Sequence, residues 1–196
     1  EEVLRIYGFN NIELSDTAHA DYLAEFPAKD IDSYKRTIGE LLVSTGFFEI
    51  WTNSLTNQAY QDKHQLTFKG KAVEVLNKLS EEQGVLRQTL LFTGLEVSAY
   101  NINRRQKDLR LFEFGKVYYK GMSGYVEEER LALYITGNRE TENWQHKTQP
   151  STYFDLAQTV SNILLKSGVA ATQEIIKDQL LEYGSRLLLN QDEIGI

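Results

Sequence analysis

The stretch DLRLFEFGKVYY, residues 108–119, decides the fold class of this chain. Apolar and aromatic side chains fill both its odd and its even positions, which is typical of a central strand buried on both faces. A second strand is indicated where Leu131, Leu133 and Ile135 alternate with smaller or polar residues. The glycine-containing stretch between them, KGMSGYVEE at 120–128, favours a hairpin loop. The sequence therefore predicts a β-sheet built around this antiparallel hairpin.

Three amphipathic helices are predicted around the hairpin. Asp30 or Asp32 can cap the first helix, and Gly46 can end it. Ser151 is the natural cap of the third. Each helix groups side chains on one face: Tyr34, Ile38, Leu41, Leu42 and Thr45 in the first; Leu91, Leu95, Ser98 and Ile102 in the second, at 90–105; and Tyr153, Leu156, Ala157, Val160, Ile163 and Leu164 in the third, at 152–167.

Shorter runs predict further strands: one is rich in aromatic and β-branched residues, and three are short apolar runs. They lie at 47–55, 72–77, 174–177 and 186–190. Strands of this size, joined by hairpins and accompanied by helices, indicate an α+β fold rather than a doubly wound one. We therefore expect an antiparallel β-sheet flanked by helices.

The beginning of the chain predicts a separate segment. The first nine residues have apolar side chains at near-helical spacing, and Gly8 can stop that helix. The polar residues that follow contain Pro27, which would break any helix running through them. We divide the chain into residues 1–29, the end of a helical module plus a connector, and residues 30–196, the main domain, truncated at its C-terminus.

Composition narrows the classes of function. The chain has 28 acidic and 21 basic residues, a net charge of −7, whereas domains that bind nucleic acid through their own surface are usually basic. It contains no cysteine, which excludes disulfides and fits a reducing compartment. No apolar run is long enough for a transmembrane helix, and no signal peptide is visible at the start. We expect an intracellular protein that binds neither DNA nor a membrane.

The sequence offers no catalytic or cofactor-binding motif. Its three histidines, His19, His64 and His146, lie far apart and fit surface or loop positions. Zinc signatures, nucleophile elbows, and the glycine patterns of phosphate-binding and dinucleotide-binding loops are absent. We therefore predict no catalytic residue and no cofactor-binding residue in this chain.

Several charged residues need an explanation of another kind. Glu127, Glu128 and Glu129 are interpreted as a solvated loop. Three cations lie at the end of the second helix: Arg104, Arg105 and Lys107. Cations at the C-terminus of a helix interact favourably with its dipole, which is enough to explain them. A contact with a partner protein or with RNA is the alternative explanation. Arg87 and Arg110 stand among apolar residues, where a guanidinium needs a carboxylate or carbonyl partner, and we favour a partner within the chain over a substrate.

Five segments, in order, resemble the β-subunit family of bacterial phenylalanyl-tRNA synthetases. EEVLRIYGFNNI resembles the end of that family's DNA-binding-like module, and GFFEIWTNSL the first strand of its catalytic-like core. LNKLSEEQGVLRQTLLFTGLEVSAYNINRR, DLRLFEFGKVYY and YFDLAQTV resemble three later segments of the same core. Lys78 and the pair Phe92-Thr93 depart from the family's usual proline and leucine-proline, and both departures affect only turn geometry.

The resemblance implies a fold, a set of partners and a metal site. The family's β core has the class II synthetase fold but is catalytically silent, and two α and two β chains form the cytoplasmic enzyme. Its α chain binds ATP and charges tRNA with phenylalanine. The family's β chain also supplies carboxylates to a magnesium site shared with the α subunit. Glu1 and Glu2 match its Glu-Glu pair, whereas its two upstream aspartates have no counterpart, so we expect an incomplete site.

The expected lack of catalytic activity can be checked against the residues that class II synthetases need for catalysis. That chemistry uses one arginine on the α-phosphate of ATP and a second on the γ-phosphate. Arg110 lies near the first position, but Phe112 follows where the family of active enzymes has an acidic residue, and no glycine-rich arginine motif is present. We expect a scaffold for the α subunit that is inactive alone. A stand-alone class II-like ligase of the biotin or lipoate type, or an RNA-binding module, is the alternative.

Overall fold

The computed structural model describes most of the chain. The described residues are 2–11, 30–60, 68–78, 80–140, 144–145, 147–176, 184–189 and 192–195. They form two compact units, Glu1–Tyr34 and Lys35–Ile196, and each is described by itself below. The boundary between the two units falls after Tyr34 in the sequence, within the helix Ile31–Ser44. The domain division expected between residues 29 and 30 stays a prediction. Among the described helices, none combines the length and hydrophobicity needed to cross a membrane.

The smaller unit begins with a short helix. Helix α1, Glu2–Tyr7, ends at Gly8, whose φ of 90° lies in the left-handed region that suits glycine, and a 3-10 turn, Phe9–Asn11, follows. These features confirm the predicted helix end. The connector expected at 10–29 lies outside the described residues from residue 12 onward. At the end of the unit, the Asp30 carboxylate accepts a hydrogen bond from the Ser33 backbone N–H at 3.0 Å and caps helix α2, Ile31–Ser44.

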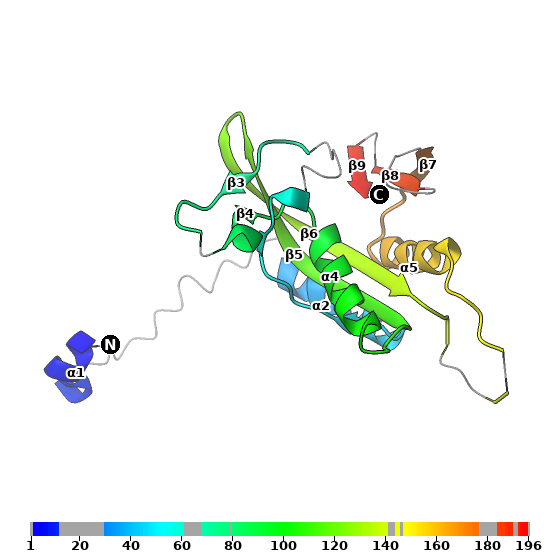
Figure 1. The fold of residues 1–196 in the computed structure, drawn as a ribbon, viewed down its shortest axis with the longest axis horizontal. Coiled ribbons are helices and arrows are strands. Elements are labelled where there is room, and N and C mark those ends of the chain that lie inside the picture. Colours follow the sequence, from blue (N-terminus) through cyan, green and yellow to red (C-terminus); the bar gives the residue numbers. More distant parts are fainter. Residues whose placement is uncertain are drawn as a thin grey trace. The chain divides into compact units, whose positions relative to one another are not determined.

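The larger unit is built around the predicted hairpin. Strand β5, Leu109–Gly121, and strand β6, Gly124–Thr136, pair antiparallel along their whole length (Figure 1). A two-residue turn, Met122 and Ser123, joins them, and Gly124 has a φ of 124°. Three consecutive residues of β5 are buried, namely Leu111, Phe112 and Glu113, so this part of the strand is covered on both faces as predicted.

The described strands form three three-stranded sheets. Beside the hairpin lies β1, Phe48–Glu49. The second sheet has the order β2, β4, β3, and the third has the order β7, β8, β9. Their bounds are Leu55–Thr56 for β2, Val73–Glu74 for β3, Val85–Leu86 for β4 (preceded by a 3-10 turn, Glu81–Gln83), Thr172–Ile176 for β7, Gly184–Leu189 for β8 and Asp192–Gly195 for β9.

Two expectations about the strands were wrong. The run at 47–55 forms two short strands in different sheets rather than one, and β1 pairs parallel with β5, whereas all the other described pairs are antiparallel. Parallel neighbours need a long crossover, and the chain between β1 and β5 contains one, with helix α4, Leu91–Ile102, in it. Phe48 pairs with Leu111 in this parallel register.

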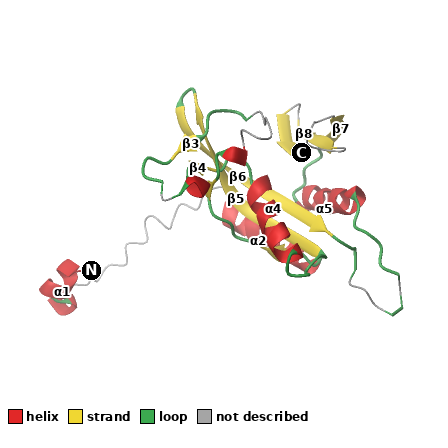
Figure 2. Ribbon diagram, in the orientation of Figure 1, coloured by secondary structure: helices red, strands yellow, loops and turns green. Residues whose placement is uncertain are grey.

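One face of the hairpin carries the main apolar core. Phe112 is the largest fully buried side chain, and it clusters with Ile38 and Leu42 of α2, with Phe47, and with Ile163 of helix α5, Tyr153–Lys166. Helix α2 therefore buries the middle of its predicted face, Ile38 and Leu42, whereas Tyr34 and Thr45 at the two ends of that face are exposed. Figure 2 shows α5 and the helix at residues 91–102 beside the long strands of the hairpin.

Helix α4 covers the opposite face of the hairpin, and it contacts the sheet through small residues rather than through large apolar ones. Leu111 and Tyr134 are register partners and point to this face, because neighbouring residues along a strand alternate. The buried residues of α4 are Thr93, Gly94 and Ser98. The Tyr134 hydroxyl donates a hydrogen bond to the Leu90 carbonyl at 2.6 Å, just before the helix. Small residues thus let the helix backbone lie directly on an aromatic ring.

The cap of α5 differs by one residue from the expectation. Thr152, not Ser151, is the cap residue, and its backbone N–H and hydroxyl both donate to the Asp155 carboxylate, at 2.7 and 2.8 Å. Arg139 adds an ion pair to Asp155 at 2.8 Å. The hydrogen bond from the Thr152 backbone, with smaller contributions from its hydroxyl and from Arg139, lowers the pKa of Asp155 from 3.8 to about 2.

This capping arrangement predicts a pH dependence of stability. Because the folded-state pKa of Asp155 lies below its unfolded value, its stabilisation is present above about pH 4 and is lost as the pH falls through about 2. Asp155→Asn should lower the melting temperature at pH 6, and the difference from the unsubstituted protein should narrow toward pH 2. Thr152→Ala, which keeps the backbone N–H, should retain most of the pH dependence. An Asp155→Asn difference that is constant from pH 6 to pH 2 contradicts the assignment.

Candidate functional site: the arginines around the central hairpin

Arg87 lies at the centre of a buried polar cluster. It follows β4, and its side chain is 3% exposed, while that of its partner Glu113 on β5 is fully buried. The Arg87 Nη1 donates to Glu113 Oε1 at 2.9 Å, and its Nε donates to the Lys116 carbonyl at 2.9 Å. The predicted need of Arg87 for an internal partner is thereby confirmed.

Thr52 completes this cluster. Its hydroxyl accepts from Arg87 Nη1 at 2.6 Å and lies 2.9 Å from each carboxylate oxygen of Glu113, and its backbone N–H donates to Glu113 Oε1 at 3.2 Å. Gly115 leaves room for the guanidinium, because a Cβ there would come within 2.5 Å of Arg87 Nη2. The cluster joins the segment after β1 to β4 and β5, which are far apart in the sequence.

Arg110 is also held by groups of this chain. Its Nη1 donates to the Thr45 carbonyl at 3.2 Å, and its Nη2 donates to the Arg139 carbonyl at 2.9 Å. These two carbonyls lie after α2 and after β6, so Arg110 ties both to the start of β5. The expectation of a carboxylate or carbonyl partner is confirmed for this residue too.

The acidic run on β6 is not the solvated loop that we expected. Glu127, Glu128 and Glu129 lie within the strand, and each one is paired with a cation. The pairs are Lys116 with Glu127 at 2.6 Å, Lys35 with Glu129 at 2.6 Å, Lys69 with Glu128 at 3.5 Å, and Arg130 with Glu128. The Tyr119 hydroxyl also donates to Glu128 and, with Arg130, lowers the pKa of that carboxyl. The carboxylates therefore neutralise cations along the hairpin.

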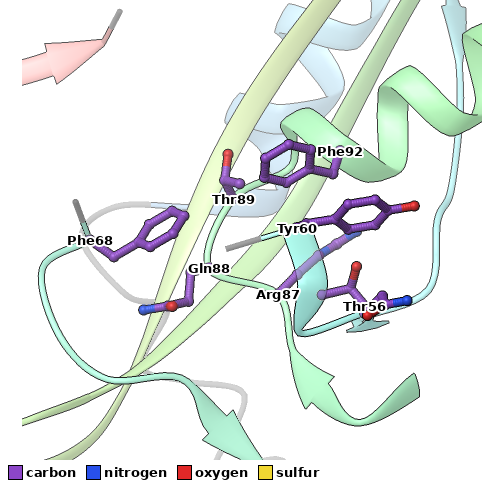
Figure 3. Close-up of a pocket in the computed structure, with 8 residues that line it drawn as sticks. Thr56, Tyr60, Phe68, Arg87, Gln88, Thr89 and Phe92 are labelled. Carbon is purple, nitrogen blue, oxygen red and sulfur yellow. The ribbon is translucent and has the colours of Figure 1, made fainter. Parts of the chain in front are cut away.

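A small hollow opens beside Arg87. It encloses about 240 Å³ of space open to solvent, with room for about one water molecule between the side chains. Tyr60 and Phe92 form an aromatic wall, stacked with ring centroids 4.9 Å apart (Figure 3). Two polar side chains of the lining are already engaged: Gln88 donates to the Gly70 carbonyl at 2.9 Å, and Thr89 accepts from the Leu91 N–H at 3.2 Å.

Tyr60 is fixed in this wall by α4. Its hydroxyl donates to the Glu96 carboxylate, and this hydrogen bond, with partial burial, raises the pKa of Tyr60 to about 12. The phenol therefore stays protonated at neutral pH and cannot act as a base there. Between the described residues that line it, the hollow is too small for a nucleotide.

The predicted metal and histidine positions can be located only in part. Glu2 begins α1, where it forms an exposed ion pair with Arg5 at 3.5 Å, and Glu1 lies outside the described residues. His19, His64 and His146 also lie outside them. Within the described ranges, no group of three or more histidine, aspartate or glutamate residues could hold a metal ion. The residues described around Glu2 thus do not by themselves form a magnesium site.

The chemistry available to the hairpin follows from these contacts. Adenylate formation needs guanidinium groups that can reach the phosphates of ATP. In the described part of the sheet, the arginines at 87, 110 and 130 all bind carboxylates or carbonyls of the chain itself. Sequence reasoning missed Glu113 and Thr52 as partners, although an acidic residue between Phe112 and Phe114 in an apolar strand is a signal that could have revealed Glu113.

Similarity to known structures supports the fold. A crystal structure of pyrrolysyl-tRNA synthetase from Desulfitobacterium hafniense aligns with a TM-score of 0.61 and 15% identity over 89% of this chain and 60% of that one. A structure described as D. hafniense PylSc, a pyrrolysyl tRNA synthetase, aligns with a TM-score of 0.55 and 17% identity, over 89% and 59% of the two chains. At this level of identity the similarity shows the fold alone. This chain therefore shares its mixed α+β arrangement with those two structures.

Sequence comparisons identify the family. The phenylalanine–tRNA ligase beta subunit of Bacteroides thetaiotaomicron is 37% identical over 178 residues, which are 86% of this chain and 22% of that protein. The corresponding subunit of Porphyromonas gingivalis is 35% identical over the same shares. The chain thus spans about a fifth of the length of these curated relatives. The family model of the phenylalanyl tRNA synthetase beta chain CLM domain matches residues 21–196. The resemblance seen in the sequence is confirmed, and the chain belongs to the family of the phenylalanyl-tRNA synthetase beta chain CLM domain.

Proposed function

We propose that this chain is the non-catalytic core of the β subunit of a phenylalanine–tRNA ligase. In this role it scaffolds a separate α subunit, which uses ATP to charge tRNA with phenylalanine. The relatives of this chain are named as beta subunits of phenylalanine–tRNA ligase, and we propose the same role for the protein to which this chain belongs. One observation of the chain itself carries the claim of catalytic silence: Arg87 beside the central hairpin, and Arg110 and Arg130 within it, are engaged by Glu113, Glu128 and backbone carbonyls.

The partners follow from the same proposal. The enzyme is an assembly of two α and two β chains in the cytoplasm, it binds tRNA, and it binds neither DNA nor a membrane. ATP is bound by the α subunit. Residues 1–29 end a preceding helical module, and residues 30–196 are the synthetase-like core.

Magnesium enters the proposal through Glu1 and Glu2. Their carboxylates would bind the ion, and the other oxygen ligands would come from residues elsewhere in the assembly, because magnesium prefers six oxygen ligands. The high exposure of the Glu2 side chain, 82%, leaves its carboxylate accessible to such a partner. The ion would hold the two subunits together at this point.

The two alternatives are not favoured. A stand-alone ligase of the biotin or lipoate type would need cations free to hold a triphosphate, whereas the hairpin arginines are committed to other groups. An RNA-binding module would need a basic surface, and the chain carries a net charge of −7.

The proposal predicts the outcome of an activity assay. The isolated chain should show no phenylalanine-dependent exchange of pyrophosphate into ATP, because the arginines at 87, 110 and 130, on and beside the central hairpin, are engaged by groups of the chain itself. The full-length β subunit, co-expressed with its α subunit, should restore exchange and serves as the positive control. Exchange above background by the pure isolated chain overturns the proposed silence, and failure of full-length β to co-purify with α overturns the proposed scaffold.

A further inference from the structure

The turn that follows α4 contains an arginine in a backbone conformation that suits glycine. Arg105 has a φ of 68°, and among the described residues it is the one non-glycine with a positive φ. Across this turn the Gln106 N–H donates to the Asn101 carbonyl at 3.0 Å, as in a Schellman motif. A Cβ is strained in this conformation, and glycine avoids the strain. Arginine at this position therefore lowers stability relative to glycine.

The other two long helices have glycine at the same place. The turn after α2 closes around Gly46, with a φ of 86°, and the turn after α5 closes around Gly168, with a φ of 67°. In both turns a backbone N–H donates to the carbonyl five residues earlier, at 3.0 and 2.9 Å, as it does after α4. Because the three backbones have the same pattern, the turn itself does not require an arginine. The Arg105 side chain needs a reason outside the turn.

The same turn concentrates positive charge. Residues 103–110, NRRQKDLR, contain four of the 21 cations and one of the 28 acidic residues, so this segment has a charge of +3 in a chain with a net charge of −7. The acidic residue is Asp108, whose carboxylate accepts a hydrogen bond from the Asn138 backbone N–H at 2.7 Å. Such a local reversal of sign is typical of a site for an anionic partner.

Two of the four cations are held by the chain, and two are not. Arg110 donates to two carbonyls, as described above. The Arg104 Cζ lies 3.3 Å from the centroid of the Tyr100 ring, and its Nη1 donates to the Tyr100 carbonyl at 3.1 Å. Arg105 and Lys107 are exposed, and no described residue forms a hydrogen bond or an ion pair with either side chain. These two side chains can therefore bind an anion without breaking a contact with the described residues.

The backbone that carries these two cations is fixed from both sides. The hydroxyl of Thr136, at the end of β6, donates to the Lys107 carbonyl at 2.7 Å, and the Schellman hydrogen bond holds the turn to α4. A fixed backbone loses little conformational entropy when its side chains bind a partner. Arg105 and Lys107 are thus presented together at one end of the hairpin.

We infer that Arg105 and Lys107 contact backbone phosphates of the tRNA. This inference rests on the proposed function and adds to it a place where this chain touches the RNA. Residues 103–108 are all polar and all exposed, so they offer charge without the apolar centre of a protein interface. Phosphate contacts need cations and no apolar cover. The acidic remainder of the chain confines the contact to this turn, which suits a subunit that assists binding rather than an independent RNA-binding module.

The test measures tRNA binding by the complex of full-length β and α subunits, using fluorescence anisotropy at several salt concentrations. Arg105→Gly should weaken binding about threefold or more and reduce the slope of log affinity against log salt concentration by about 1, as expected for one lost phosphate contact. The melting temperature of the complex should stay the same or rise, because glycine suits the positive φ. Adding Lys107→Gln should reduce the slope by about 2 in all.

Two further variants separate charge from backbone conformation. Arg105→Lys keeps the cation and should retain most of the tRNA affinity. Lys166→Gln removes an exposed cation from the last turn of α5, so it is the matched control at another helix C-terminus. It should leave the tRNA affinity and the salt slope unchanged.

The other outcomes overturn the inference. If Arg105→Gly with Lys107→Gln leaves the tRNA affinity and its salt slope unchanged, while the unsubstituted complex binds tRNA, the inference fails and the proposed function stands. Weaker association of the two subunits with normal tRNA affinity would assign these cations to a protein contact instead. An equal loss in Lys166→Gln would show a general effect of net charge. If the unsubstituted complex does not bind tRNA, the proposed function fails, and the inference fails with it.

Discussion

Arg87→Ala is expected to destabilise the protein by about 3–5 kcal/mol, because it leaves the Glu113 carboxylate buried without its cation. Glu113 is fully buried, and its remaining donors would be the hydroxyl and backbone N–H of Thr52. Those two hydrogen bonds cannot replace a guanidinium in a site that excludes water. The free energy of unfolding, measured by urea denaturation, should fall by this amount.

Two further variants test whether the loss of stability in Arg87→Ala comes from leaving the Glu113 charge buried without a partner. Arg87→Met combined with Glu113→Gln removes both charges and keeps similar volumes, so it should cost less than Arg87→Ala alone. Lys116→Met breaks an exposed ion pair between Lys116, on the same strand, and Glu127 on β6, with side chains 46% and 49% exposed, so it should lower the free energy of unfolding far less than Arg87→Ala. If Arg87→Ala and Lys116→Met unfold at the same urea concentration, the buried cluster has no special role.

This cluster also shows how far sequence reasoning reaches. A guanidinium among apolar residues must have a partner, so the requirement was predictable from the residues around Arg87. The identity of the partner was not, because Glu113 lies 26 residues away and meets Arg87 only through the pairing of separate strands. Thr52 was still less visible, since its strand was expected to continue through that position.

The long elements were predictable and the short ones were not. The hairpin at 109–136 and the three helices follow from local periodicity, which is strong over 12 or more residues. Strands of two residues, such as β2 and β4, are fixed by distant partners such as the hydrogen bond from the Arg87 N–H to the Ser54 carbonyl at 2.9 Å. The residues next to such a short strand in the sequence therefore do not reveal its partner.

Helix α4 shows a limit of periodicity itself. The spacing of Leu91, Leu95, Ser98 and Ile102 predicted one side of a helix, and of these four residues only Ser98 is buried. It could not say which side meets the sheet, because a glycine beneath an aromatic ring can make the small face the packing face. The site of closest contact is Gly94, where a Cβ would lie 2.0 Å from Tyr134 Cζ.

Gly94→Ala is therefore expected to destabilise the protein by about 3 kcal/mol or more, although alanine is the better helix former. The Tyr134 ring cannot move aside easily, since it is 8% exposed and its hydroxyl is bonded to the Leu90 carbonyl at 2.6 Å. Either the helix must lift from the sheet or that hydrogen bond must break. Thermal denaturation followed by circular dichroism measures the loss.

The same substitution in α2 provides the control, because Gly39 is also inside a helix that covers the hairpin. A Cβ at Gly39 would meet only Phe114, at an ordinary 3.9 Å, so Gly39→Ala should stabilise the protein by about 0.5–1 kcal/mol. Tyr134→Val should partly rescue Gly94→Ala, giving a double variant less destabilised than the sum of the two single changes. If both alanine substitutions raise the melting temperature, α4 does not lie on Tyr134 as described.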